Sequence, residues 1–186
     1  MKNGKQKAYT KLAAGVGINL TLGVLYLWSI ISKTLGADHG WTTQQATIPY
    51  PTAIHLCVQG PPTTGRRQDR FGPRRFVLTG ITLVGLGLLA SGFASGPLWM
   101  ILTFGLLVGL GVGFAYASVT PAVMKWFHRD SKGLVTGLVV AGFALASAYL
   151  GPVAYYLIHG LGISWTFWFL GLFALAAGSP LALLLQ

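Results

Sequence analysis

Acidic residues are almost absent from this sequence, which has no glutamate and only three aspartates among its 186 residues. Enzymes that work by acid–base chemistry commonly place carboxylates or histidines in pairs, and metal sites gather acidic, His and Cys side chains. The sequence offers no such pair or cluster, and no nucleophile beside a base. The single cysteine, Cys57, excludes an internal disulfide. These absences argue against an enzyme, and we expect no metal and no cofactor.

Charge of either sign is also scarce, since only 9% of the residues are charged and 53% are hydrophobic. A soluble domain typically carries about 25% charged residues, so this chain is expected to be an all-α polytopic membrane protein in a lipid bilayer. The net charge of +10 is an alternative sign of nucleic-acid binding. However, the basic residues lie between long apolar runs, where membrane topology explains them, and no nucleic acid is expected as a partner.

Six stretches have the roughly 20 residues that cross a hydrocarbon layer about 30 Å thick. We expect transmembrane helices at about 12–31, 43–64, 76–95, 98–119, 134–158 and 165–185. An outer loop is expected from Lys33 to Trp41 and a cytoplasmic connection from Pro121 to Lys132. Of the thirteen Lys and Arg residues, only Lys33 falls on the outer side. This asymmetry predicts a multi-pass protein of the inner (cytoplasmic) membrane with both termini in the cytoplasm.

The second expected span is the least regular, because it contains Pro49, Pro51, Pro61 and Pro62. Each interior proline removes a backbone donor and its ring clashes with the preceding turn. We therefore expect this helix to be broken or poorly packed between Pro49 and Pro62.

Small residues mark the expected packing surfaces of two later spans. Gly105, Gly109 and Gly113 recur every four residues, so they form one stripe along the fourth span. Such stripes let membrane helices approach closely. Gly137 is the corresponding small residue of the fifth span, where Pro152 is expected to cause a kink.

The segment between the second and third spans combines Gly, Asp and Arg in a fixed order, reading Gly65-x-x-x-Asp69-Arg70-x-Gly72-x-Arg74-Arg75. Glycine allows a tight turn, and Pro73 suits the first turn of the next helix. A basic loop that only sets topology is the simpler reading. The spacing, however, resembles the signature loop between helices 2 and 3 of major facilitator superfamily transporters, with every fixed position filled.

Further stretches resemble the oxalate/formate antiporter family within that superfamily. They are residues 40–50, 68–74, 109–116, 125–127, 133–143 and 165–167. Residues 51–64 depart from the family's smooth second helix, and His128 stands where the family often has proline.

The resemblance implies twelve helices in two six-helix halves, which transport by alternating access around a central site. The chain would then be the N-terminal half, without the C-terminal half, of an exchanger of small organic anions such as oxalate, formate or monocarboxylates. Its expected partners are a small carboxylate substrate and that second half. A six-helix protein or fragment that does not transport, and acts only with a partner, is the alternative.

Candidate site residues fall into two groups. The resemblance implies a gating role for Gly65, Asp69, Arg70, Gly72, Arg74 and Arg75, in which Asp69 latches the two halves together; a solvated loop acid is the alternative. Polar and aromatic side chains inside the spans could line a substrate cavity or serve only helix packing and interface anchoring. They are Asn19, Tyr26, Trp28, Tyr116, Tyr149 and Tyr155. His55 and His159 are weaker candidates for carrying protons, since one lies in the proline-rich span and the other in an expected loop.

Overall fold

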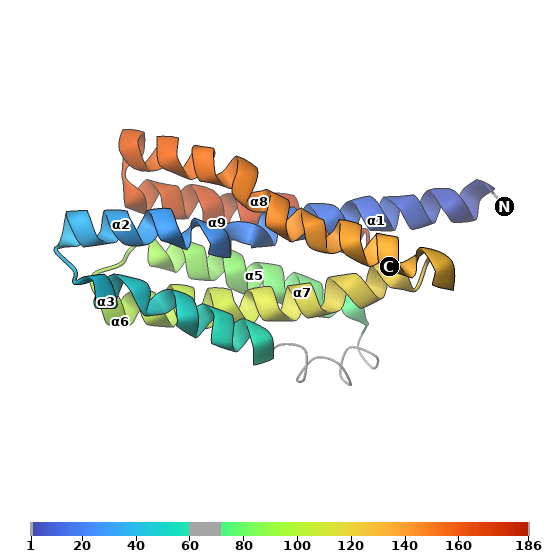
Figure 1. The fold of residues 1–186 in the computed structure, drawn as a ribbon, viewed down its shortest axis with the longest axis horizontal. Helices are drawn as coiled ribbons and strands as arrows, with labels where there is room; N and C mark the ends of the chain where they lie inside the picture. Colours follow the sequence, from blue (N-terminus) through green and yellow to red (C-terminus); the bar gives the residue numbers. More distant parts are fainter. Residues whose placement is uncertain (1, 60–71, 186) are drawn as a thin grey trace.

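The structure, a computed structural model, describes residues 2–59 and 72–185, with side chains from residue 6 onward. Within these ranges the chain is helical and contains no strand. In chain order the elements are α1 (Lys2–Leu22), η1 (Gly23–Leu27), α2 (Trp28–His39), α3 (Thr43–Thr47), a helix at residues 49–59, α5 (Pro73–Ser91), α6 (Pro97–Met100), η2 (Ile101–Val108), α7 (Gly109–Met124), η3 (Arg129–Ser131), α8 (Lys132–Leu161) and α9 (Ile163–Leu183). The helices run along the long axis of the molecule, and both chain ends lie toward the same end of the bundle (Figure 1).

Five helical stretches in the described ranges are long and apolar enough to cross a membrane. They are Gln6–His39, Pro73–Ser91, Pro97–Met124, Arg129–Leu161 and Ile163–Leu183. The expected all-α polytopic fold is therefore confirmed. The second expected span is described only up to residue 59, where residues 43–47 and 49–59 are helical.

The first span is longer than the sequence predicted. α1, η1 and α2 follow one another without a loop, and the helix ends only at Gly40, whose φ of 65° lies in the left-handed region that favours glycine. The expected outer loop from Lys33 to Trp41 is thus wrong, because residues 33–39 belong to α2. A fall in hydropathy indicates where a helix leaves the hydrocarbon layer. The helix itself can continue beyond that point, because its backbone hydrogen bonds do not depend on the lipid. Lys33 consequently lies on a helix.

The prolines disturb the second span less than expected. Thr42 caps α3 through a capping box with Gln45, and the helix is interrupted only at Ile48, directly before Pro49. Residues 49–59 are helical, so the expected break between Pro49 and Pro62 is wrong for the described part of this span. The alternative of poor packing there stays a prediction. Pro61 and Pro62 lie outside the described residues.

Two other prolines sit inside helices. Pro121 lies in α7, which continues to Met124, so the expected loop from Pro121 begins too early. Membrane helices tolerate proline where neighbours satisfy the freed backbone groups. α8 runs unbroken through Pro152, and the kink expected there stays a prediction. Pro73, as expected, occupies the start of α5, after Gly72 with a φ of 82°.

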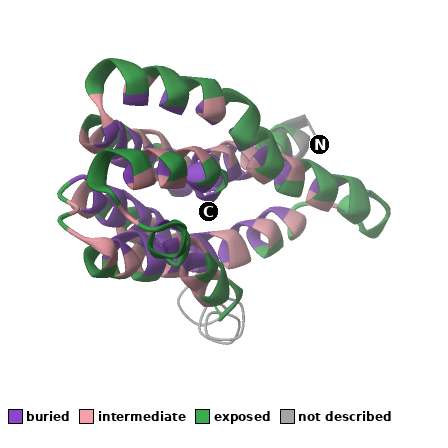
Figure 2. Cartoon of the chain, turned by 60° about the vertical axis from the view of Figure 1, so that its left-hand side comes forward, coloured by how far each residue is buried: buried purple, intermediate pink, exposed green. Residues whose placement is uncertain are grey.

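Burial is uneven across the bundle. α5 packs against α7 and α9, and α1 packs against α8 and α9. By contrast, only 28% of the most apolar stretch of the α8 span is buried, against 67% for the first span. Figure 2 shows exposed residues along the outer side of α8, the helix at the top of the view. Its exposed apolar side chains are Leu134, Leu138, Val140, Leu145, Tyr149, Val153, Tyr155, Tyr156 and Leu161. This chain therefore leaves a long apolar side of α8 uncovered.

The glycine stripe of η2 and α7 holds the second span in place. A Cβ atom added to Gly109 would lie 2.6 Å from the carbonyl oxygen of Ala53, and one on Gly113 would lie 2.7 Å from that of Cys57. Gly105 faces Thr52 and the Pro49 carbonyl at slightly larger distances. Only glycine allows the two backbones to approach this closely. Gly137 differs: it is exposed, and nothing described lies within 4 Å of its added Cβ.

Gly109→Ala is therefore expected to destabilise the bundle, because its methyl group would press on the Ala53 backbone. Overpacking of this kind typically costs about 1–3 kcal/mol. Gly137→Ala is the matched control: alanine favours helix over glycine by up to about 1 kcal/mol, and nothing obstructs it. Thermal unfolding in detergent should show a lower midpoint for Gly109→Ala only. Equal midpoints for the two variants would contradict the packing described here.

Candidate functional site

A small cavity lies where the first, second, fourth and fifth spans meet. We call it the aromatic pocket, and its volume is about 260 Å³. Its lining residues come from η1, the helix at 49–59, α7 and α8: Tyr26, Cys57, Tyr116, Val140, Phe143 and Ala144. Two of the six predicted cavity residues, Tyr26 and Tyr116, are thus brought together, although they lie far apart in the sequence.

Phe143 is the centre of this pocket. Its ring centroid lies 5.3 Å from the rings of both Tyr26 and Tyr116, in edge-on and tilted arrangements. Such contacts fix the two tyrosine rings in place. Tyr26 is 44% exposed and Tyr116 is partly buried, so the pocket opens to the surface of this chain.

The short 3₁₀ helix η1 positions Tyr26 in the pocket. A Cβ added to Gly23 would lie 2.1 Å from the Ala146 Cβ and 2.7 Å from the Phe143 carbonyl oxygen. The backbone of η1 therefore touches α8 at a point where only glycine fits. A 3₁₀ helix advances with three residues per turn rather than 3.6, so it changes which side chains face a neighbour. Tyr26 is exposed to the pocket, whereas Leu25 and Leu27 are buried.

Three other predicted cavity residues have structural roles. Trp28 is buried, lies against Phe104 with ring centroids 4.3 Å apart, and donates from Nε1 to the Ala46 carbonyl. Asn19 is fully buried and donates from Nδ2 to the Val139 carbonyl at 2.7 Å. Tyr149 donates its phenol proton to the Leu20 carbonyl at 3.0 Å. These bonds tie the first span to the second span and to α8. A role of the three residues in lining a substrate cavity stays a prediction.

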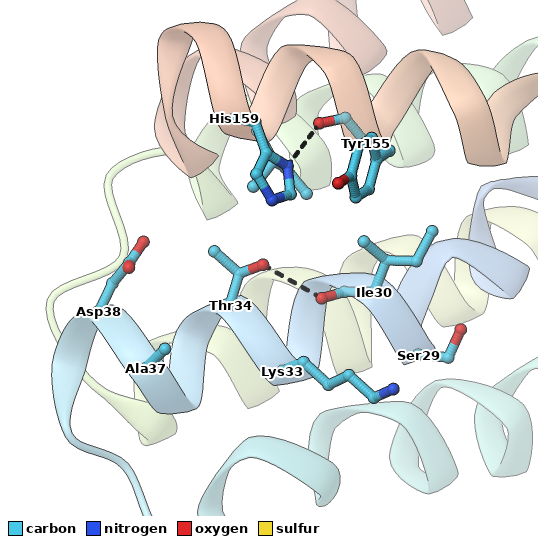
Figure 3. Close-up of a pocket in the computed structure, with 9 residues that line it drawn as sticks. Ser29, Ile30, Lys33, Thr34, Ala37, Asp38, Tyr155 and His159 are labelled. Atoms are coloured by element: carbon cyan, nitrogen blue, oxygen red, sulfur yellow. Dashed lines mark hydrogen bonds between the residues drawn. The ribbon is translucent and has the colours of Figure 1, made fainter.

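Tyr155 belongs to a second and larger cavity, between α2 and α8 near Gly40 and Gly162. We call it the far-end pocket, and its volume is about 540 Å³. Its lining residues are Ser29, Ile30, Lys33, Thr34, Ala37, Asp38, Tyr155, Ile158 and His159. Figure 3 shows Tyr155 and His159 pointing from α8 toward α2.

The signature segment is described only in part. Gly65, Asp69 and Arg70 lie outside the described residues, so their gating role stays a prediction. Gly72 precedes α5, and Arg74 and Arg75 lie in its first turn, where Arg74 is partly buried and Arg75 exposed. Gly72, with a φ of 82°, directly precedes Pro73 at the start of α5. The tight connection over the whole segment stays a prediction.

Four residues of the aromatic pocket were not predicted. Cys57 lacked any signal beyond being the single cysteine. Val140, Phe143 and Ala144 follow the i, i+3, i+4 spacing that places side chains on one helix face, and this pattern could have indicated them. The pattern is not specific, however: α8 is apolar on most sides, and many triplets of apolar residues with this spacing occur along it.

The aromatic pocket offers two phenol groups and a thiol on an otherwise apolar wall. Phenol groups can donate hydrogen bonds to a carboxylate, and apolar walls accommodate its carbon atoms. Among the residues that the structure describes, no Lys, Arg or His lines this pocket. Ionisable side chains occur instead in the far-end pocket, where Lys33, Asp38 and His159 lie.

Comparison with known proteins gives one family. Residues 12–186 match the description "Major Facilitator Superfamily". The chain is 25% identical to an uncharacterized MFS-type transporter, YhjX, of Escherichia coli (strain K12), over 93% of this chain and 43% of that protein. It is 28% identical to probable anion transporter 3, chloroplastic, of Oryza sativa subsp. japonica, over 88% of this chain and 32% of the relative. It is 30% identical to monocarboxylate transporter 2 of Homo sapiens, over 74% of this chain and 30% of that protein. The chain thus spans less than half the length of these relatives.

Proposed function

The chain belongs to the Major Facilitator Superfamily, and on this premise we propose that it forms one six-helix half of a secondary transporter that exchanges small organic anions by alternating access. Its membership of a transporter family speaks against an enzyme. The finer proposal, an exchanger of oxalate, formate or monocarboxylates, rests on the quoted sequence resemblance and on the names of the anion and monocarboxylate transporters among its relatives.

One structural observation carries the proposal: Tyr26, Tyr116 and Phe143 converge from three spans on a pocket that opens to the surface. Transporters of inverted-repeat construction place their substrate between repeats, near the middle of the membrane. A second half that covers the exposed side of α8 would enclose the aromatic pocket. The two phenol groups would then face a carboxylate in a site from which water is largely excluded.

Counterflow in proteoliposomes tests the proposed substrate class. This chain, reconstituted with a second six-helix half, should take up labelled oxalate only when the vesicles are preloaded with oxalate, formate or a monocarboxylate. Vesicles preloaded with glucose at equal osmolarity are the control. Uptake that is equally fast in both preparations would contradict anion exchange.

We also propose that both termini face the cytoplasm in the inner membrane, because all but one of the Lys and Arg residues lie on that side of the expected spans. Reporter fusions after Gly40, Gly96 and Gly162 should then report an external location. Fusions after Arg75 and Lys132 should report an internal one. A single reversed loop would overturn this topology.

A further inference from the structure

We propose that one anionic phospholipid, of the kind represented by phosphatidylglycerol, binds at the end of the bundle where α9 ends, with Lys11 and Lys125 holding its phosphate. The site is a cavity distinct from the two described above. We call it the basal pocket, and its volume is about 410 Å³. Its lining residues are Lys11, Pro73, Ala122, Lys125, Trp126 and Leu185. The proposal goes beyond the proposed function, because none of these residues lies on α8, whose exposed side the second half is proposed to cover.

The basal pocket lies where four spans reach the same end of the bundle (Figure 1). Pro73 begins α5, Ala122 lies in the last turn of α7, and Leu185 follows α9. Lys125 and Trp126 come directly after α7. The ends of membrane spans meet the layer of lipid headgroups, where tryptophan is enriched. The pocket is therefore at the height of the phosphate groups of a phospholipid layer.

Lys11 is held at this pocket by two contacts. Its ammonium group donates a hydrogen bond to the carbonyl oxygen of Leu184, the residue that caps the end of α9. The same nitrogen lies 5.4 Å from the centre of the Trp126 ring, a distance at which a cation is attracted by the face of the ring. An ammonium group has three hydrogens, so Lys11 can bond to a phosphate oxygen while it keeps the bond to Leu184.

The charges around the basal pocket favour a negatively charged headgroup. Lys11 and Lys125 both line it, and among the residues that the structure describes no acidic side chain does. Clusters of basic residues at the ends of membrane spans attract anionic lipids. A zwitterionic lipid also has a phosphate, but its choline group would bring a further positive charge to two Lys side chains, and like charges repel. The pocket thus suits a lipid with net negative charge.

The rest of the lining explains why a lipid fits better than a soluble anion. Pro73, Ala122, Trp126 and Leu185 form an apolar wall, in which Ala122 and Leu185 are buried. A free phosphate would lose hydrating water against this wall and gain no hydrogen bond from it. The glycerol and first acyl carbons of a lipid would gain apolar contacts there. Trp126 is 43% exposed, so its ring is accessible at the rim of the pocket.

Titration of the purified chain in dodecyl maltoside with dioleoylphosphatidylglycerol, followed by thermal unfolding, tests the site. The rise of the unfolding midpoint with lipid concentration gives the dissociation constant, because a ligand of the folded state stabilises it. Dioleoylphosphatidylcholine has the same acyl chains and no net charge, so it is the control lipid. Phosphatidylglycerol should bind roughly 25-fold more tightly, about fivefold for each Lys beside the headgroup. Equal affinities for the two lipids would overturn the proposal.

Variants of the two Lys residues separate this site from attraction by charge in general. Lys11→Gln and Lys125→Gln should each lower the preference for phosphatidylglycerol roughly fivefold, whereas Lys11→Arg and Lys125→Arg keep the charge and should retain it. Lys7→Gln is the matched control, because Lys7 is exposed, lies one turn earlier on α1 and does not line the pocket. The preference compares two lipids on the same variant, so a general loss of stability cancels. An equal fall of the preference in Lys7→Gln and Lys11→Gln would overturn the site.

Two soluble ligands separate a lipid from other anions that two Lys side chains could hold. Glycerol 1-phosphate has the phosphate without acyl chains, and a glutamate-rich peptide has negative charge without a phosphate. Neither should raise the unfolding midpoint at the concentration at which phosphatidylglycerol saturates the chain. A rise with either ligand as large as that with phosphatidylglycerol would exclude a lipid as the occupant. Anion exchange does not enter these measurements, so the lipid site and the proposed function succeed or fail separately.

Discussion

Vesicles that contain only residues 1–186 are expected to exchange labelled oxalate no faster than vesicles without protein. Alternating access requires one repeat to rock against another around a site that both enclose. In the described ranges the aromatic pocket opens to the surface, and the outer side of α8 is uncovered. Under the proposed function, residues 1–186 alone therefore hold part of a site and have nothing to move against. The measurement is the initial rate of exchange in proteoliposomes, compared with protein-free vesicles.

Reconstitution with the second six-helix half of a related anion transporter is the positive control, and exchange should appear there. If residues 1–186 alone exchange oxalate robustly, a pair of identical chains must enclose the site, and the need for a different second half is wrong. If exchange is absent in both preparations while the chain is folded, the alternative of a membrane protein that does not transport is favoured.

Tyr116→Phe is expected to reduce the apparent affinity of the assembled transporter for its anion by about 10- to 150-fold. This range corresponds to the roughly 1.5–3 kcal/mol that a hydrogen bond to a charged group contributes. Phenylalanine keeps the ring that packs against Phe143 and removes only the phenol oxygen. Tyr26→Phe should act in the same way, since Tyr26 meets the same Phe143 ring from the first span. Concentration-dependent exchange measures both effects.

Tyr9→Phe is the matched control, because Tyr9 is 64% exposed and its ring contacts Phe127, outside the aromatic pocket. Its exchange should equal that of the unmodified chain. Tyr149→Phe offers a further contrast: its phenol group bonds to the Leu20 carbonyl, so this variant should lower thermal stability more than affinity. Unchanged affinity in both Tyr116→Phe and Tyr26→Phe would exclude the aromatic pocket as the substrate site.

The sequence alone determined that this is a helical membrane bundle, because the length of an apolar run and the placement of Lys and Arg depend only on local order along the chain. It also placed the turn before Pro73 and the stripe of Gly105, Gly109 and Gly113, since backbone freedom and four-residue spacing are local properties. The course of the chain around Lys33 could not be read in this way. Hydropathy falls there, while the helix continues to Gly40.

Only the tertiary structure decided which side chains face a pocket. Trp28 and Tyr26 are two residues apart and looked equally suited to a cavity, yet η1 exposes Tyr26 and buries Trp28. Lys33 and His159 come from distant helices and line the same pocket only because α2 packs against α8. A helix that is apolar on most sides gives no local sign of which face meets lipid and which meets protein. The rotation of α8 about its own axis is fixed by close contacts such as that of Gly23 with Ala146, which exist only once the helices are packed.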